Sequence, residues 1–168
     1  MKTAMPGIAH KSDVGGVHLN LSDDTEVRAA WQDMAGRLGP RCLVAPMAPA
    51  GTEMVFGLVN DPQFGPMVLI GTGGIFVEVL GDSVLAKPPF DAVCARGLID
   101  RLQGRAMLDG VRGKPAADLD ALAQTLARFS VLAATLGAAI DELDLNPVIA
   151  GPDGAVAVDA LVVPSTKP

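Results

Sequence analysis

The stretch of sequence from residue 142 to residue 147 is Glu142-Leu143-Asp144-Leu145-Asn146-Pro147. Polar and apolar side chains alternate along it, which is typical of a β-strand that buries one face. Because residues two apart on a strand point to the same side, the three polar side chains are expected to face one way and the leucines the other. The sequence therefore predicts a polar strand face in the C-terminal part of the chain.

A second strand is predicted to return beside this one. The residues Gly151-Pro152-Asp153-Gly154 are a turn signal, and the strand expected after them contains Asp159. A hairpin about that turn would bring Asp159 close to the polar face, and carboxylate and amide oxygens are the ligands that Mg²⁺ prefers. The same residues also fit an ordinary solvated hairpin, and spacing alone leaves both interpretations open.

The rest of the chain predicts an α+β fold with a mixed or antiparallel sheet packed against helices. Strands and helices do not alternate regularly, which disfavours a doubly wound dinucleotide domain, and the absence of a linker predicts one domain over residues 1–168. Helical spacing places Trp31 in the core. The predicted strands are 17–21, 42–47, 53–59, 66–70, 75–80, 83–86, 140–149 and 155–162. The first two predicted helices are capped by Ser22 and Asp91, the third begins at Asp118, and they end near Leu38, Leu102 and Leu136.

The chain is acidic and rich in apolar residues. Its 168 residues carry a formal net charge of −6, and 49% of them are hydrophobic. This much apolar surface excludes an intrinsically disordered chain, and the negative charge argues against broad binding to nucleic acid or to an anionic membrane. The two cysteines form no metal or disulfide motif, and no apolar stretch is long enough for a signal peptide core or a membrane span. We therefore expect a soluble cytoplasmic protein.

A second polar cluster lies near the N-terminus, in His10-Lys11-Ser12-Asp13-Val14-Gly15-Gly16. A turn at Gly15 and Gly16 would let backbone N–H groups approach a phosphate, while Lys11 adds charge and His10 offers a nucleophile or an acid–base group. Lys2 could add a second cation. A polar hairpin without a ligand is the alternative interpretation. The two ends of the chain nevertheless offer complementary halves of a nucleotide site, cations for phosphate and oxygen ligands for a metal.

Seven blocks of sequence occur in a distinctive order along almost the whole chain. Each block alone is weak evidence, but the ordered set resembles the ATP-grasp domain of the NDP-forming acyl-CoA synthetases, relatives of the succinyl-CoA synthetase β subunit. The blocks are Lys2, His10-Lys11-Ser12-Asp13-Val14-Gly15-Gly16-Val17, Gly51-Thr52-Glu53-Met54-Val55-Phe56-Gly57, Asp61-Pro62-Gln63-Phe64-Gly65-Pro66, Gly71-Thr72-Gly73-Gly74-Ile75-Phe76-Val77-Glu78, Arg112-Gly113, and residues 142–147 with Asp159.

The resemblance implies ATP-dependent ligation of a carboxylic acid to coenzyme A, with ADP and phosphate as products. The reaction would run through an acyl phosphate and a phosphohistidine carried on a companion domain or subunit. The expected cofactors are ATP and Mg²⁺, and the expected partners are the CoA-binding domain and the ligase domain of such an enzyme.

The resemblance also implies roles for single residues. Lys2 and Glu53 match positions near the nucleotide, and backbone groups of Val44, Ala45 and Met47 match the hinge that contacts adenine. His10 and Asp144 match catalytic positions, His10 in phosphate relay and Asp144 beside the phosphohistidine. Asn146 and Asp159 match the Mg²⁺ ligands, in agreement with the argument from the strand pattern.

The same comparison implies a partial domain, because Lys2 matches a position well inside the domain of that family. We therefore expect an uncovered apolar surface around Lys2 and residues 44–47, which would favour a homo-oligomer. Two alternatives follow. The chain could be a non-catalytic interaction or regulatory module with a vestigial nucleotide site, or the ATP-grasp part of a larger acetyltransferase.

Overall fold

The computed structural model describes residues 1–8, 10–74, 81–111, 113 and 115–165. Contacts divide the chain into two compact units, unit 1 from Met1 to Met47 and unit 2 from Ala48 to Pro168, and each is described by itself. The strand expected at residues 75–80 lies outside the described residues. None of the described helices combines the length and the apolar character needed to cross a bilayer.

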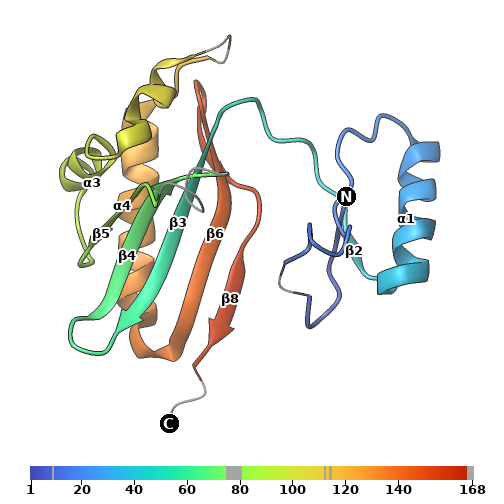
Figure 1. The fold of residues 1–168 in the computed structure, drawn as a ribbon, viewed down its shortest axis with the longest axis horizontal. Helices are drawn as coiled ribbons and strands as arrows, with labels where there is room; N and C mark the ends of the chain where they lie inside the picture. The colour runs from blue at the N-terminus through green and yellow to red at the C-terminus, as the bar shows by residue number, and fades with distance from the viewer. Residues whose placement is uncertain (9, 75–80, 112, 114, 166–168) are drawn as a thin grey trace. The chain divides into compact units, whose positions relative to one another are not determined.

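The described residues of unit 1 contain two short strands and one helix, of which β2 and α1 are labelled in Figure 1. Strand β1 (Lys2–Thr3) pairs antiparallel with β2 (Cys42–Leu43), and helix α1 covers Asp24–Leu38 between them. The carboxylate of Asp23 caps α1 by accepting from the N–H of Glu26, and Gly39 ends the helix with φ 111°. The predicted helix is therefore confirmed, except that Asp23 is the capping residue instead of Ser22.

Three details of unit 1 correct the sequence predictions. The strand expected at 17–21 is reduced to a bridge between Val17 and Lys2, since Asn20 adopts a left-handed φ of 57° that interrupts extended backbone. The strand expected at 42–47 ends at Leu43, three residues before Pro46, which has no N–H to donate to a ladder. Trp31 is 42% exposed, because its indole N–H turns back to the carbonyl of Pro40 (3.0 Å).

Unit 2 is built on an antiparallel sheet. Within the described residues the strand order is β5-β4-β3-β6-β7, with β8 also paired to β6. The long central strands β3 and β6 lie side by side, and the turn between β6 and β7 pairs Gly151 with Gly154, as expected. The strands are β3 (Thr52–Asp61), β4 (Gly65–Thr72), β5 (Ser83–Ala86), β6 (Ile140–Gly151), β7 (Gly154–Ala157) and β8 (Leu161–Pro164).

Helices cover one face of this sheet, as Figure 1 shows for α3 and α4. Helix α3 (Ala92–Ile99) and helix α4 (Leu119–Leu136) are capped by Asp91 and Asp118, as the sequence predicts. Two 3-10 helices, η1 (Gln103–Asp109) and η2 (Gly137–Ala139), lie in the connections. The core lies between these helices and the sheet; Phe129 of α4 packs on Phe56 of β3 with ring centroids 5.7 Å apart.

The hydrophobic face of α4 differs slightly from the one that leucine spacing predicts. Leu122, Leu126 and Phe129 are buried, whereas Leu132 is 45% exposed. The small residues Ser130 and Ala133 are buried in its place, because the helix packs closely on its neighbours there. These elements confirm the predicted α+β class.

Candidate functional site

The polar strand face predicted from residues 142–147 is present on β6. Leu143 is buried in the core on the helix side, whereas Glu142 and Asn146 are exposed and Asp144 is half-buried. Opposite them on β3, Val59 pairs with Glu142 and Gly57 pairs with Asp144. The polar row therefore lies on the face of the sheet opposite to α3 and α4.

A β-bulge lies at Asn146 and Pro147. Val148 pairs with Met54 and Leu145 with Phe56, so these two residues of β6 stand opposite the single residue Val55. A bulge adds a residue to one strand and re-aims its side chains. Proline is suited to this position because it has no N–H to leave unpaired.

The returning chain places Asp159 opposite Asn146. Val148 pairs with Ala157 and Asp144 with Leu161, and the N–H of Val158 donates to the carbonyl of Pro147 (2.9 Å). Three residues on each chain lie between these pairs, so register sets the two polar residues across from each other. The strand predicted at 155–162 is interrupted at this point into β7 and β8.

Residues opposite each other on neighbouring strands have Cβ atoms about 4.5–5.5 Å apart. In a regular ladder, oxygens of two such side chains can reach one ion; Asn146 lies in a bulge and Asp159 between β7 and β8, so their shared reach to an ion stays a prediction. Among the described residues no group of three or more His, Cys, Asp and Glu side chains could hold a metal. Two oxygen ligands match the way in which Mg²⁺ is commonly held, with water and substrate phosphates completing its shell.

Glu53 lies on the same face as this pair, farther along β3. It is exposed, pairs with Ile149, and stands four residues from Gly57, the partner of Asp144, or about 13–14 Å along the strand. Its carbonyl accepts from the N–H of Gly73 (2.7 Å), and a Cβ on Gly73 would come within 2.9 Å of the backbone of Glu53. The close approach at this position requires glycine.

The N-terminal cluster forms a tight turn in unit 1. The N–H of Gly15 donates to the carbonyl of Ser12 (3.0 Å), and the N–H of Gly16 donates to the carbonyl of Lys11 (2.7 Å). Gly15 has φ 63°, and a Cβ on Gly16 would come within 2.9 Å of the carbonyl of Lys11. Both N–H groups are thus used inside the turn, so the role predicted for them at a phosphate stays a prediction.

The remaining residues predicted in unit 1 lie around this turn and on β2. His10 is exposed at the start of the turn, and Lys2 lies on β1, next to Val17. Val44 and Met47 are 56% and 55% exposed, and Ala45 is exposed between them, in agreement with the apolar surface expected at residues 44–47. Lys2, around which this surface was also expected, is half-buried.

Side chains of α1 hold the turn from the other side. Arg37 donates to the carbonyls of Val14 (3.1 Å) and Gly15 (3.2 Å) and to both carboxylate oxygens of Asp33. The hydrogen bond from the Arg37 guanidinium to the Asp33 carboxylate lowers the pKa of Asp33 below its ordinary value and raises the pKa of Arg37. His18 Nε2 lies 3.7 Å from Asp33 on the same side. Sequence reasoning missed this group; the spacing of four between Asp33 and Arg37 was the signal for a helical ion pair.

A buried carboxylate in unit 2 was also missed. Asp82 is 4% exposed and accepts from the hydroxyl of Thr72 (2.9 Å) and from the N–H groups of Gln103 and Gly104 (2.8 Å each). Burial raises the pKa of this carboxyl, but the donors Gly104, Gln103 and Thr72 outweigh it and hold the pKa below its usual value. Asp82 therefore ties the end of β4 to η1.

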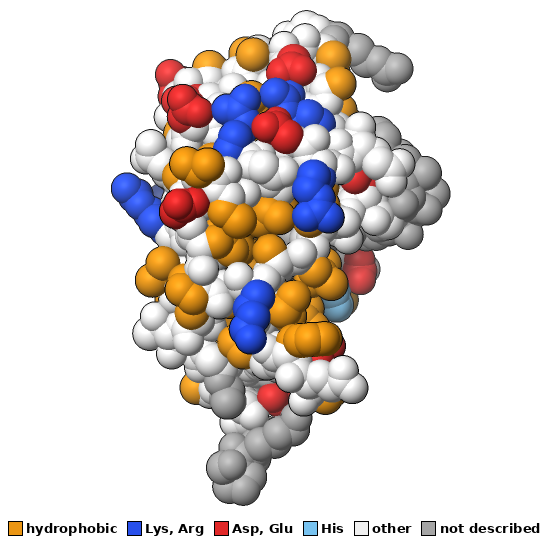
Figure 2. Space-filling view, turned by 90° about the vertical axis from the view of Figure 1, so that its left-hand side faces the viewer, with side chains coloured by type: hydrophobic (Ala, Val, Ile, Leu, Met, Phe, Trp, Pro, Cys, Tyr) orange, Lys and Arg blue, Asp and Glu red, His pale blue; other side chains and the backbone are white. Residues whose placement is uncertain are grey.

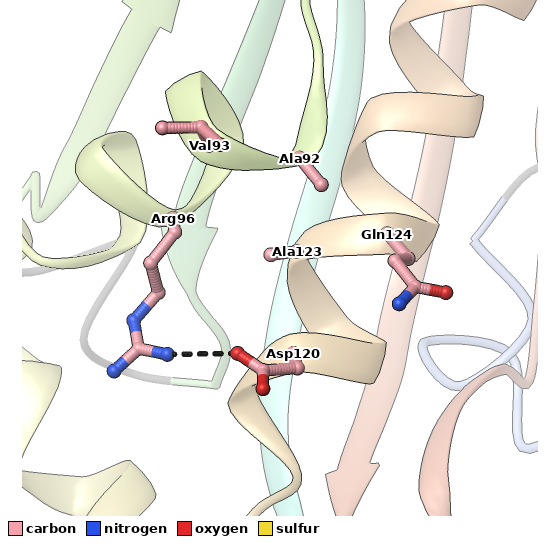
Figure 3. A pocket seen from close by; sticks show the side chains of 6 residues that line it. All are labelled: Ala92, Val93, Arg96, Asp120, Ala123 and Gln124. Atoms are coloured by element: carbon pink, nitrogen blue, oxygen red, sulfur yellow. Dashed lines mark hydrogen bonds and ion pairs between the residues drawn. The ribbon is translucent and has the colours of Figure 1, made fainter.

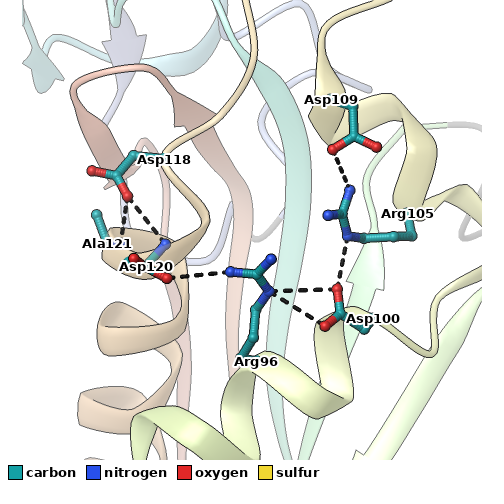
Figure 4. Close-up of polar contacts among 7 residues, drawn as sticks. All are labelled: Arg96, Asp100, Arg105, Asp109, Asp118, Asp120 and Ala121. Atoms are coloured by element: carbon teal, nitrogen blue, oxygen red, sulfur yellow. Dashed lines mark hydrogen bonds and ion pairs between the residues drawn. The ribbon is translucent and has the colours of Figure 1, made fainter.

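A hollow of about 350 Å³ lies between α3 and α4 (Figure 3). Arg96 and Asp120 form an ion pair across it (3.2 Å), and Arg96 also pairs with Asp100 (3.3 Å). Arg105 continues this chain of ion pairs to Asp109 (Figure 4). Basic, acidic and hydrophobic side chains are mixed on the side of the molecule drawn in Figure 2. Because its charges are paired, this hollow is a poorer candidate for a nucleotide than the polar sheet face.

Comparison with known proteins identifies the family. A family model described as an ATP-grasp domain matches residues 1–163. The β subunit of the ADP-forming acetate–CoA ligase I of Pyrococcus furiosus is 37% identical over 171 residues, with 97% of this chain and 73% of that subunit covered. The chain belongs to the ATP-grasp family of the ADP-forming acyl-CoA synthetases.

Two further relatives support this membership. A trans-feruloyl-CoA synthase from an unknown prokaryotic organism is 41% identical over 173 residues. The structure of acetyl-coenzyme A synthetase 1 of Candidatus Korarchaeum cryptofilum, solved with coenzyme A and Mg-AMPPCP, superposes with a TM-score of 0.85 at 38% identity, covering 98% of this chain and 75% of that one. In that protein the phosphohistidine segment points towards the nucleotide binding site.

The chain is shorter than these ATP-grasp relatives. It spans about three quarters of the β subunits, 73% of the one from Pyrococcus furiosus, but only 24% of the feruloyl-CoA synthase. It is thus a partial ATP-grasp domain, as the sequence predicts, and it corresponds to one part of a larger ligase.

Proposed function

We propose that this chain is the nucleotide- and Mg²⁺-binding part of an enzyme that joins a carboxylic acid to coenzyme A and forms ADP. The observation that carries the proposal is strand register: the pairs on either side of Asn146 and Asp159 share one register, which supports a position for both on the face of the ATP-grasp sheet opposite to α3 and α4. The CoA-binding and ligase segments would come from other domains or subunits.

In this proposal Asn146 and Asp159 hold Mg²⁺ with one oxygen each. Bound there, the ion would neutralise charge on the nucleotide phosphates during phosphoryl transfer. Asp144, two residues before Asn146 on the same face, would accept a hydrogen bond from the imidazole N–H of an incoming phosphohistidine and so orient its ring. Glu53 would lie near the nucleotide on the same face.

Unit 1 carries further residues that we propose to bind the nucleotide. The side chains of Lys2 and Lys11 would contribute positive charge to the phosphates, and His10 would stand at the start of the turn in a position to take part in phosphate relay. Backbone groups of Val44, Ala45 and Met47 would contact adenine. We propose that the turn at Gly15 and Gly16 lies beside a phosphate, with side chains making the contacts, because both glycine N–H groups are bonded within the turn.

The proposed setting is the cytoplasm. Both cysteines, Cys42 and Cys94, are free thiols in the structure, which agrees with a reducing compartment. ATP, Mg²⁺ and coenzyme A are available there.

ADP release that depends on both coenzyme A and a carboxylate tests the proposal. The assay uses the chain assembled with the CoA-binding and ligase segments, together with the variants Asn146→Ala and Asp159→Ala. Because each variant removes a metal ligand, we expect turnover at limiting Mg²⁺ to fall by about 10–100-fold and to recover in part as Mg²⁺ is raised. Asp153→Ala, in the exposed turn between β6 and β7, is the matched control and should leave turnover unchanged.

Two outcomes would count against the proposal. Turnover that is the same in Asn146→Ala, Asp159→Ala and the control would remove the metal assignment. An assembled wild-type protein that releases no ADP, together with the absence of Mg-ATP binding in calorimetry, would instead favour a non-catalytic module.

A further inference from the structure

The turn that carries the predicted phosphate contacts is not held by its own hydrogen bonds alone. Two bonds close it internally, from Gly15 to Ser12 and from Gly16 to Lys11. The carbonyls of Val14 and Gly15, at its C-terminal end, are bound by the guanidinium of Arg37. A side chain of α1 therefore holds the main chain of residues 11–16.

Arg37 is itself held in place. Its Nη2 lies 2.6 Å from Asp33 Oδ2 and its Nε lies 3.2 Å from both carboxylate oxygens. Such a forked pair fixes the plane of the guanidinium as well as its position. His18 Nε2 lies 3.7 Å from the same oxygen, Oδ2. The guanidinium thus joins Asp33 on α1 to two carbonyls that lie 23 and 22 residues before Arg37 in the sequence.

Close packing also holds the turn against α1 and β1. A Cβ on Gly16 would come within 3.2 Å of Leu38 Cδ1 and 2.7 Å of Thr3 Cγ2, so the turn lies directly against the end of α1 and against β1. Thr3 itself is 1% exposed. Arg37 and this packing hold the C-terminal end of the turn. They therefore also set the position of the N-terminal end of the turn, where His10 and Lys11 lie.

We propose that Arg37, held by Asp33, is a positioning residue of the nucleotide site, and that it fixes the main chain of the Lys11–Gly16 turn so that His10 and Lys11 meet the phosphates. This inference rests on the proposed function. Arg37 itself acts through the turn, and a displacement of about 1 Å in such a group can lower the rate about 100-fold.

The variants Arg37→Ala and Arg37→Lys test the proposal. Lysine keeps the positive charge at the C-terminal end of α1, but it cannot bind two carbonyls and a carboxylate through one planar group. Arg28→Ala is the matched control, because Arg28 is an exposed arginine on the same helix. The two internal bonds of the turn remain in both Arg37 variants, so in these two the turn should loosen without loss of the fold.

Two measurements are needed. Hydrogen exchange on the 168-residue chain should be about 10-fold faster at the amides of Gly15 and Gly16 in both Arg37 variants and unchanged in Arg28→Ala. In the assembled ligase the KM for ATP should rise about 10-fold with the KM for coenzyme A unchanged. Added guanidinium ion should restore part of the loss in Arg37→Ala and none in wild type or the control.

The outcomes separate this inference from the proposed function. Equal exchange in Arg37→Ala and Arg28→Ala overturns it, and so does faster exchange with an unchanged KM for ATP. A wild-type ligase without ATP-dependent turnover contradicts the proposed function instead, whatever the exchange data show. If Arg37→Ala does not fold, Arg37→Lys and Asp33→Asn take its place, and Asp33→Asn should give the same changes at smaller size.

Discussion

Asp82 is a charged residue that lies almost fully buried in unit 2. Its carboxylate is almost fully buried, and three donors from Thr72, Gln103 and Gly104 converge on it. A charge removed from water is tolerated only where hydrogen bonds replace its hydration. Here two of the donors are backbone N–H groups of η1, so the carboxylate secures a connection between strand and helix that hydrophobic packing alone would not orient.

Replacing Asp82 by Asn should destabilise unit 2. The amide puts an NH₂ group where an acceptor is needed, and at neutral pH we expect a loss of about 2–3 kcal/mol in the free energy of unfolding. Urea unfolding followed by far-UV circular dichroism measures it. Asp61→Asn is the control, since Asp61 accepts from Gln63 and Phe64 in an exposed turn and should cost less than about 1 kcal/mol.

The cost of Asp82→Asn should depend on pH. The pKa of Asp82 is lower in the folded protein than in the unfolded chain, so the carboxylate stabilises the fold above the unfolded value of about 3.9. This stabilisation is lost as the pH falls through the folded-state pKa. The difference between wild type and variant should therefore shrink below about pH 4, and a difference that stays constant down to the acid transition would contradict the assignment.

At the scale of elements, two kinds of glycine lead to opposite predictions for replacement by alanine. Gly36 in α1 and Gly97 in α3 have open space where a Cβ would be. In contrast, a Cβ on Gly104 would lie 2.7 Å from Thr72 Cγ2 and 3.0 Å from Asp82 Oδ2. Gly36 and Gly97 lower the stability of their helices, and no close contact requires a glycine there. Gly104 is required because two elements approach each other closely at this position.

Gly36→Ala and Gly97→Ala should each stabilise the unit that contains them, by about 0.5–1 kcal/mol, because alanine loses less backbone entropy in a helix. Gly104→Ala should have the opposite sign, with a loss of about 1–3 kcal/mol from the forced shift of Thr72 and Asp82. Chemical unfolding of each variant measures these changes. A destabilising effect of Gly97→Ala would mean that α3 is packed more tightly than the structure shows.

At the scale of the whole molecule, the two units differ in how much they bury. Unit 2 has a continuous core between its sheet and helices. In the described part of unit 1, the buried hydrophobic side chains are Ala30 and Met34. Its β-pairing is limited to short segments. Small two-stranded elements are marginally stable by themselves.

Amide exchange should therefore be faster in β1 and β2 than in β3 and β6, since local opening costs least where few apolar contacts are lost. Hydrogen exchange at neutral pH over minutes to hours measures this directly. Similar protection in the two units would show that they unfold together as one cooperative body.

The exposed apolar side chains of unit 1 lead to a separate prediction. Leu43, Val44 and Met47 are 49%, 56% and 55% exposed, and such a cluster favours association. Sedimentation velocity should show a concentration-dependent increase in mass that Val44→Glu reduces. Val93→Glu, at an 81% exposed position on α3, is the control and should leave the mass unchanged. A strictly monomeric wild type at high concentration would rule out this surface as a self-association site.

Local signals predicted most of the elements well. Helices α1, α3 and α4 and strands β3 to β6 occur where capping residues, turn glycines and alternation place them. The errors lie where non-local contacts override local pattern: Trp31 turns to Pro40, and the segment after Val17 leaves the strand. The contacts of Arg37 with the turn and of Asp82 with η1 could not be assigned from sequence. The partners lie 22 and 23 residues from Arg37 and 21 and 22 residues from Asp82, and only folding brings them together.

Local patterns were enough to predict the α+β class, the family and the polar side of residues 142–147, because alternation and ordered motifs are properties of neighbouring residues. The pairing partners of the strands follow only from the tertiary structure. The bulge at Asn146 and Pro147 and the interruption between β7 and β8 depend on how distant strands pair, and pairing register is set by burial of the whole sheet. The turn at Gly151–Gly154 already predicts that Asp159 returns towards Asn146, whereas the bulge and the interruption around these two residues depend on tertiary pairing.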